Sequence, residues 1–253
     1  MCGARKPGVP AYVAVPHAAS VGLVPGYNGA AYLGAEYNPF QSGGDPNAPT
    51  FTVNNLRLPN GMTLGDLEDR KHLLGGFDTL RRDIDRSGAL DNLDKFQRQA
   101  YEMISGPAAR QAFDINKEEP RLRDRYGRHP WGQSCLLARR LVEAGVTFVT
   151  VHMGGWDHHS AIEQGMKNVL PPLDRAIAGL VTDLDDRGLL EKVAICVCGE
   201  FGRTPRVNKD AGRDHWGEAG FCLLGGGGIK GGVVVGSTTA RGERPKDRPV
   251  RPE

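Results

Sequence analysis

Residues 193–204, VAICVCGEFGRT, decide the predicted fold, because an apolar run rich in β-branched residues ends directly in a polar cluster. Residues 146–159, VTFVTVHMGGWDHH, have the same order of strand and polar cluster. Between these two stretches, apolar residues recur at helical spacing from Leu173 to Leu184 and predict an amphipathic helix that ends near Gly188. Strand, helix and strand in this order are typical of a βαβ unit, in which parallel strands place a site beyond their carboxyl ends.

Carboxylate and imidazole side chains gather in these two clusters and in a third, residues 212–216. Asp157 and His159 are two residues apart on a turn led by two glycines, so both can face one point. Glu200 is the second residue after the second strand, and the Asp214–His215 pair can fold back over the same crevice. If the two strands are neighbours, spaced about 5 Å apart, these groups could share a divalent metal. The expected metal ligands are Asp157, His159, Glu200, Asp214 and His215.

Two arginines and one hydroxyl lie beside these candidate ligands. The guanidinium groups of Arg203 and Arg213 suit tetrahedral oxyanions such as phosphate or sulfate, so one of them could hold a substrate ester. The alternative is an ion pair that ties the loop to Glu200 or Asp214. Thr204 is the hydroxyl next to the cluster, and it could act as a nucleophile if a metal or a base lies within hydrogen-bond distance. Arg203 and Thr204 are therefore the candidate catalytic residues.

The rest of the chain divides into three parts. Residues 1–62 are rich in turn-forming Pro, Gly and Asn, and only residues 11–15 read as a strand. Residues 63–130 predict a helical insertion, with a capped helix from Thr63, a second helix over 91–104 and a short one over 108–113. Residues 131–253 predict the βαβ core, with a helix over 133–144 that Gly145 ends, and strands over 146–151, 193–198, 221–224 and 233–235.

Composition is that of an ordinary globular protein. The 253 residues are 39% hydrophobic and 25% charged, and the net charge of +2 predicts no nucleic-acid partner. No apolar run approaches the roughly 18 residues that span a bilayer, and no apolar stretch of the signal-peptide kind follows residues 1–7.

Five cysteines, an odd number, predict no disulfide framework. Cys196 and Cys198 should point to one face of their strand. We interpret them as small apolar side chains of a strand buried on both faces, with a thiol pair for metal or redox chemistry as the alternative.

The motifs themselves resemble those of a large bacterial family known as domain of unknown function 1501, which is placed in the alkaline phosphatase and sulfatase superfamily. The resemblance extends over essentially the whole chain. Its matching segments include residues 26–32 (GYNGAAY), 137–146 (LARRLVEAGV), 155–159 (GWDxH), 199–205 (GEFGRTP) and 212–216 (GRDHW). Position 158 is His where the family usually carries Thr.

This resemblance implies an α/β fold of the alkaline-phosphatase type, with a mainly parallel sheet between helical layers and one or two divalent ions (Zn, Ca, Mg or Mn) at the strand ends. It implies that Asp157 and His159 bind one metal, that Glu200 stands where relatives place an Asp, and that His215 is a late ligand, with Asp214 binding or orienting it. Relatives commonly carry export signals, which implies a periplasmic or extracellular location. Relatives also begin with a strand and a Gly-Gly-Pro-Ser segment, and end with a further strand and helix. We therefore expect an incomplete domain whose nucleophile lies outside this sequence.

The leading hypothesis is a metal-dependent hydrolase of phosphate or sulfate esters, acting on a small-molecule or polysaccharide ester. One alternative is a non-catalytic, cell-surface or polysaccharide-binding protein of the same fold. Another is an inactive truncated fragment.

Overall fold

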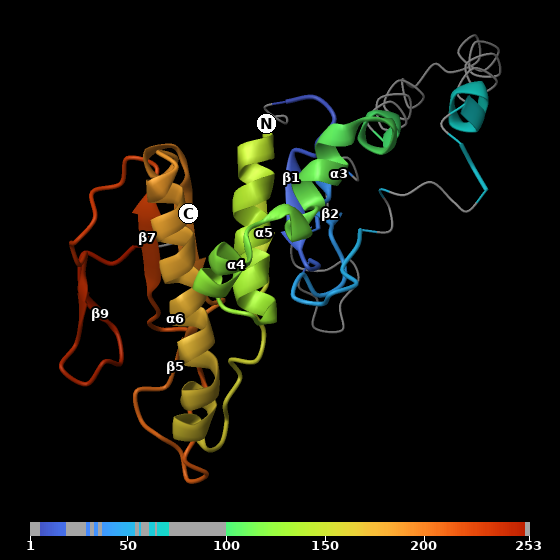
Figure 1. Ribbon diagram of the computed structural model, residues 1–253. Helices are drawn as coiled ribbons and strands as arrows, with labels where there is room; N and C mark the ends of the chain where they lie inside the picture. Colours follow the sequence, from blue (N-terminus) through green and yellow to red (C-terminus); the bar gives the residue numbers. More distant parts are fainter. Residues whose placement is uncertain are drawn as a thin grey trace, which may run out of the picture. The chain divides into compact units, whose positions relative to one another are not determined.

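The computed structural model describes residues 6–18, 29–30, 33–34, 37–53, 56, 61–63, 65–70 and 100–250 (Figure 1). The chain divides into two compact units. Residues 1–124 and 128–152 form the first unit, and residues 125–127 and 153–253 form the second. Among the described residues, no helix combines the length and the apolar character needed to cross a bilayer.

The first unit contains a three-stranded parallel sheet in the order β2-β1-β3. Its strands are β1 (Tyr12–Val15), β2 (Phe40–Gln41) and β3 (Phe148–Val151). β1 is the central strand, and its residues 13–15 are fully buried. The predicted strands over 11–15 and 146–151 are thus confirmed in type, and the mixed α/β character with a parallel sheet is confirmed as well.

Helix α5 (Pro130–Ala144) packs against β1, β3 and α3. Its residues 136, 137 and 141 are leucines with no exposed surface, and they supply much of the core of this unit. Gly145 adopts a left-handed conformation with φ 112°, and its N–H bonds to the Leu141 and Val142 carbonyls. A residue without a Cβ is favoured there, so the predicted glycine terminator is confirmed.

Directly before α5 come the short helical elements α3 (Pro107–Phe113), η4 (Ile115–Lys117) and α4 (Pro120–Tyr126). The predicted cap at Thr63 is also present, because the Thr63 backbone N–H donates to Asp66 Oδ2 at 2.7 Å and the Asp66 N–H donates to Thr63 Oγ1 at 3.2 Å. Residues 65–70 and 100–105 are helical, whereas residues 71–99, which carry most of the two predicted helices, lie outside the described residues.

The second unit is built around helix α6 (Ile162–Asp186), followed by η5 (Leu190–Lys192). The helix starts well before the predicted stretch and contains Pro171 and Pro172, which sequence rules expect to interrupt a helix. Tyr126 anchors it, because its buried hydroxyl donates to Asp183 at 2.8 Å. Gly179 permits this approach, since a Cβ there would lie 3.0 Å from the Tyr126 Cα.

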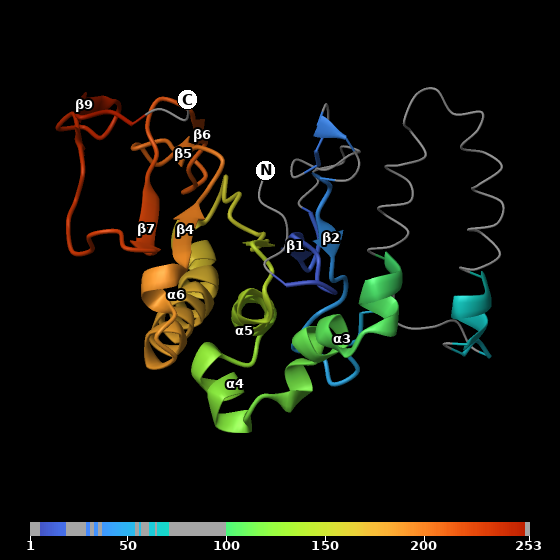
Figure 2. The same ribbon diagram turned by 90° about the horizontal axis from the view of Figure 1, so that it is seen from above.

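Short antiparallel ladders complete the second unit. β4 (Ala194–Cys198) pairs with β7 (Cys222–Gly226), β5 (Gly202–Arg203) with β6 (His215–Trp216), and β8 (Ser237–Thr238) with β9 (Pro245–Asp247). Figure 2 shows β4 and β7 side by side, with α6 next to them.

The strands over 146–151 and 193–198 belong to different units, so their expected parallel pairing stays a prediction. β3 pairs with β1, and β4 pairs antiparallel with β7. The sequence located both strands correctly. A local apolar pattern, however, does not indicate which strand pairs with which.

Two expectations for the second unit are wrong. Residues 233–235 lie outside the strands, and all three valines are more than half exposed. β4 is not covered on both faces, since Ile195 and Val197 are half-buried while Cys196 and Cys198 are exposed. This alternation of half-buried and exposed side chains is typical of a strand with one face open to solvent.

A buried ion cluster stabilises the first unit. Arg139 is 2% exposed, and its guanidinium lies 2.8 Å from both Glu118 and Glu143. Arg140 forms a second ion pair with Glu118. Burial by itself would raise the pKa of Glu118, but the hydrogen bonds and charges of Arg139 and Arg140 outweigh it and lower this pKa below the ordinary value.

Replacing Glu118 should therefore strongly destabilise the protein, because Arg139 would keep its charge in a buried position. We expect Glu118→Ala to lower the free energy of unfolding by about 3 kcal/mol. The exposed neighbour provides the control, and Glu119→Ala should change it by less than about 0.5 kcal/mol. Urea unfolding followed by circular dichroism measures both values. Equally small effects of the two substitutions would contradict a stabilising role for the buried ion cluster.

The same residue predicts a pH dependence. Because folding lowers the pKa of Glu118, its contribution is complete above the unfolded-state pKa and is lost as the pH falls through the lower, folded-state pKa. Wild-type protein should lose stability with acidification over this range more steeply than Glu118→Gln does.

Candidate metal centre

The β5–β6 ladder joins two motifs that are distant in the sequence. Gly202 pairs with Trp216, and Arg203 pairs with His215. Side chains directly opposite each other in such a ladder leave the same face, so Arg203 and His215 become neighbours. Glycine is required at position 202, because a Cβ there would lie 1.7 Å from the Ala219 carbonyl oxygen.

A second set of backbone contacts brings the GWDHH motif to this ladder. Ser160 and Ala211 form an antiparallel bridge, and the Arg213 N–H donates to the His158 carbonyl at 3.0 Å. The first residues of α6 are held in the same way, since the Ala161 and Ile162 N–H groups donate to the carbonyls of residues 210 and 211. The carbonyl groups of this loop therefore accept hydrogen bonds from N–H groups at the start of α6, which have no acceptor within the helix.

Asn208 connects both sides of this arrangement. Its amide nitrogen donates to the His159 carbonyl and to Asp214 Oδ1, each at 3.0 Å. Its amide oxygen accepts the N–H groups of Asp210 and Gly212. Sequence reasoning missed this residue, although an Asn in a Gly-containing loop is a known signal for hydrogen bonding to nearby backbone.

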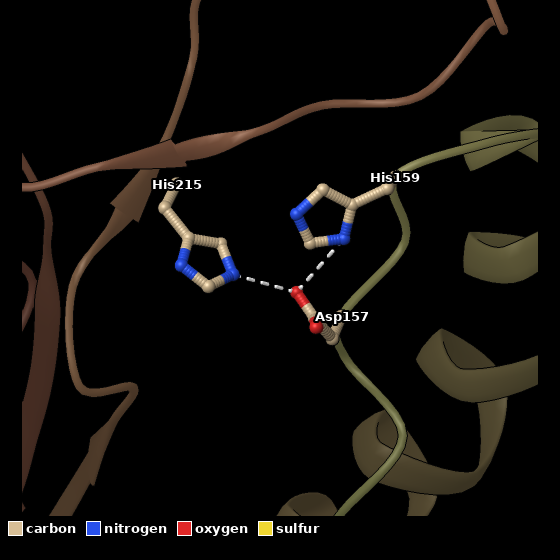
Figure 3. A group of neighbouring side chains, drawn as sticks. All are labelled: Asp157, His159 and His215. Carbon is tan, nitrogen blue, oxygen red and sulfur yellow. Dashed lines mark hydrogen bonds and ion pairs between the residues drawn. The ribbon is translucent and has the colours of Figure 1, made fainter.

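These contacts bring Asp157, His159 and His215 together (Figure 3). Asp157 Oδ1 lies 2.9 Å from His215 Nε2 and 3.2 Å from His159 Nδ1. One ligand atom from each residue lies within 4.8 Å of those of the other two. Phe201, a second residue that the sequence analysis did not single out, supports the cluster, with its ring centroid 4.6 Å from that of His215.

Asp157 is the electrostatic centre of the group. Hydrogen bonds from His215 and from Arg203 Nη1, the latter at 2.5 Å, lower the pKa of Asp157 to about 2. The carboxylate is therefore ionised at neutral pH and can only accept hydrogen bonds. His215 Nε2 consequently acts as the donor in this contact.

The other predicted site residues have different positions. Glu200 is not part of the three-residue cluster, and its nearest described contact is an ion pair of 3.8 Å with Arg203. Asp214 accepts from Asn208 and lies outside the cluster. Thr204 holds the loop, because its hydroxyl donates to the Arg206 carbonyl at 2.9 Å and accepts the Asp214 N–H at 3.1 Å.

The two arginines also differ from each other. Arg203 forms ion pairs with Asp157 and Glu200, which is the tethering role that the sequence left open as an alternative. Arg213 pairs with neither Glu200 nor Asp214 here and instead donates to the carbonyls of Thr204 and Pro205. The expected ion pair is therefore wrong for Arg213, because the loop offers it two backbone acceptors.

The three clustered side chains fit a metal ion in chemistry and in spacing. One carboxylate with two imidazoles is a donor set that zinc and related divalent ions use. With metal–ligand bonds of about 2.0–2.1 Å, tetrahedral ligands lie roughly 3.3 Å apart, close to the 2.9 and 3.2 Å separations here. All three side chains are about half exposed, so an ion can reach them from solvent.

Gly212 provides a test of the loop that builds the centre. A Cβ at this position would lie 2.0 Å from the His159 carbonyl carbon, whereas a Cβ at Gly217 would meet nothing within 4 Å. We expect Gly212→Ala to lower the free energy of unfolding of the second unit by about 1–3 kcal/mol. Gly217→Ala should change it by less than about 0.5 kcal/mol. Urea unfolding followed by tryptophan fluorescence distinguishes the two, and similar values would contradict the described packing.

Comparison with known proteins identifies the family. Residues 1–253 match the family described as "Protein of unknown function (DUF1501)". No curated protein and no solved structure matches the chain. Since the match spans the whole sequence, the chain belongs to the DUF1501 family.

Proposed function

We propose that this chain is a metal-dependent hydrolase of phosphate or sulfate esters with an alkaline-phosphatase-like fold. The observation that carries the proposal is the convergence of Asp157, His159 and His215 from two separate motifs. A structural salt link would need only one of the two imidazoles, whereas a metal ion needs several donors around one point.

Asp157, His159 and His215 would hold the ion. A bound divalent cation polarises an ester oxygen and lowers the pKa of a bound water. Asp157 enters this role already ionised, because its pKa of about 2 leaves no proton to displace at neutral pH. Each imidazole must offer a nitrogen lone pair, and His215 can do so only after giving up its hydrogen bond to Asp157.

Arg203 would bind the ester. Its guanidinium lies next to the proposed metal position, held by Asp157 and Glu200. With Asp157 engaged as a metal ligand, the planar guanidinium of Arg203 would be available for the oxygens of a tetrahedral oxyanion. Glu200 would keep the arginine oriented from the other side.

The other residues support these groups. Thr204 and Asp214 fit positioning roles in the loop, because their polar atoms already bond to backbone and to Asn208. With the Thr204 hydroxyl so occupied, a water or a hydroxyl from another segment is the better nucleophile. The resemblance to exported proteins adds the proposal of a periplasmic or extracellular location.

A specific observation favours a second candidate, a non-catalytic binding protein that keeps a structural metal. None of the three clustered side chains is a hydroxyl or a thiol, and the nearby Thr204 hydroxyl donates to backbone. Such a protein would bind metal at the same residues without ester turnover.

Metal content and turnover of the full chain test the two candidates. After dialysis against Mn²⁺ or Zn²⁺, we expect Asp157→Ala to bind the ion at least about tenfold more weakly than wild type, since even residues behind the ligands cost 10–100-fold when changed. Asp210→Ala, an exposed aspartate of the adjoining loop, is the control and should bind like wild type.

Turnover of p-nitrophenyl phosphate and p-nitrophenyl sulfate separates the candidates. Metal-dependent hydrolysis that Asp157→Ala abolishes and Asp210→Ala retains would support the hydrolase. Bound metal without hydrolysis would contradict it in favour of the binding protein, and equal metal binding by wild type and Asp157→Ala would remove both.

A further inference from the structure

Three cysteines lie on one face of the β4–β7 ladder. Cys198 is paired directly with Cys222, and Cys196 lies two residues before Cys198 on the same strand. Because side chains alternate along a strand and directly paired residues share a face, all three thiols leave the same side. All three are free and exposed.

The sulfur atoms are close together, with Cys196 at the centre. Its Sγ lies 3.7 Å from that of Cys222 and 4.0 Å from that of Cys198. The other residues of this face are Ala194, Leu224 and Gly226, which bring no carboxylate or imidazole. The face therefore offers sulfur donors in an apolar setting.

The separations between Cys196 and its two neighbours suit a metal ion better than a disulfide. With metal–sulfur bonds of about 2.3 Å, two thiolates on one ion lie roughly 3.7–4.0 Å apart, as Cys196 and its two neighbours do. A disulfide needs about 2.05 Å between the sulfurs and Cα atoms within roughly 7 Å. Cys196 and Cys222 are diagonal partners, for which the Cα separation is about 7–8 Å, so a disulfide between them would require the strands to move.

We propose that Cys196, Cys198 and Cys222 form a binding site for a soft, thiophilic metal ion of the Cu⁺, Zn²⁺ or Cd²⁺ class. Thiolates select such ions over hard cations. This site is separate from the carboxylate–imidazole centre, and it does not depend on the function proposed for that centre.

Desolvation raises the pKa of Cys196 and Cys198 above the ordinary value. Thiols bind a metal as thiolates, so metal binding releases protons. Proton release should therefore accompany binding, which calorimetry in two buffers of different ionisation enthalpy measures.

A Cd²⁺ titration of the reduced full chain tests the proposal. Cys2→Ala serves as the background to remove the amino-terminal thiol. Thiolate-to-cadmium charge-transfer absorption reports only sulfur-bound Cd²⁺, so the Asp157 centre does not contribute. We expect the absorption to saturate at one Cd²⁺ per chain, and Cys196→Ala to weaken binding by more than about tenfold.

Cys135 supplies the matched control. It lies 1% exposed in α5, and burial raises its pKa to about 12, so Cys135→Ala should leave Cd²⁺ binding unchanged. Cys222→Ser provides a second ligand variant if Cys196→Ala does not fold by circular dichroism, and it should show the same loss. Absence of the charge-transfer band in the background protein, or unchanged affinity in the ligand variants, would overturn the proposal.

Discussion

The backbone ladder between β5 and β6 is the constraint on which the candidate centre depends. Pairing Arg203 with His215 brings the GEFGRT and GRDHW motifs face to face. The Ser160–Ala211 bridge then attaches the GWDHH motif to the same loop. Without these backbone contacts, three polar segments would have no reason to meet, because exposed side chains gain little from each other in water.

The ionised Asp157 orients the side chains around one point once the backbone contacts have brought them together. Two imidazoles and one guanidinium surround its Oδ1, and hydrogen bonds from His215 and Arg203 keep the pKa at about 2. Under the proposed function, a metal ion held at this oxygen would compete with the guanidinium of Arg203. Arg203 would then be free to bind an anion.

The sequence predicts the local elements of this chain well and their pairing poorly. The Gly145 terminator, the Thr63 cap and the strands over 146–151 and 193–198 all follow from short-range chemistry, and the structure confirms them. Partner choice is a long-range property, and for that reason the antiparallel ladders β4–β7 and β5–β6 were not recoverable from the sequence. The same holds for the open face of β4, since apolar content does not say what covers a strand.

For the candidate site, too, the sequence predicts local chemistry better than long-range contacts. Asp157, His159 and His215 could be selected because metal chemistry restricts ligand types, and the structure brings these three together. Glu200 and Asp214 were equally plausible by type, but ladder register and the Asn208 amide direct them elsewhere. Asn208 carries no distinctive chemistry of its own, and only coordinates reveal how many loop contacts it makes.

Binding of Mn²⁺ by the full chain, followed by NMR of the histidine imidazoles, tests the central claim most directly. Mn²⁺ suits a carboxylate–imidazole site and avoids thiolates, and it broadens the resonances of nuclei close to it. A shared ion predicts that His159 and His215 broaden together at the same low Mn²⁺ concentration and that Asp157→Ala removes the effect. Broadening of the two rings at different concentrations, or of neither, would contradict a common metal centre.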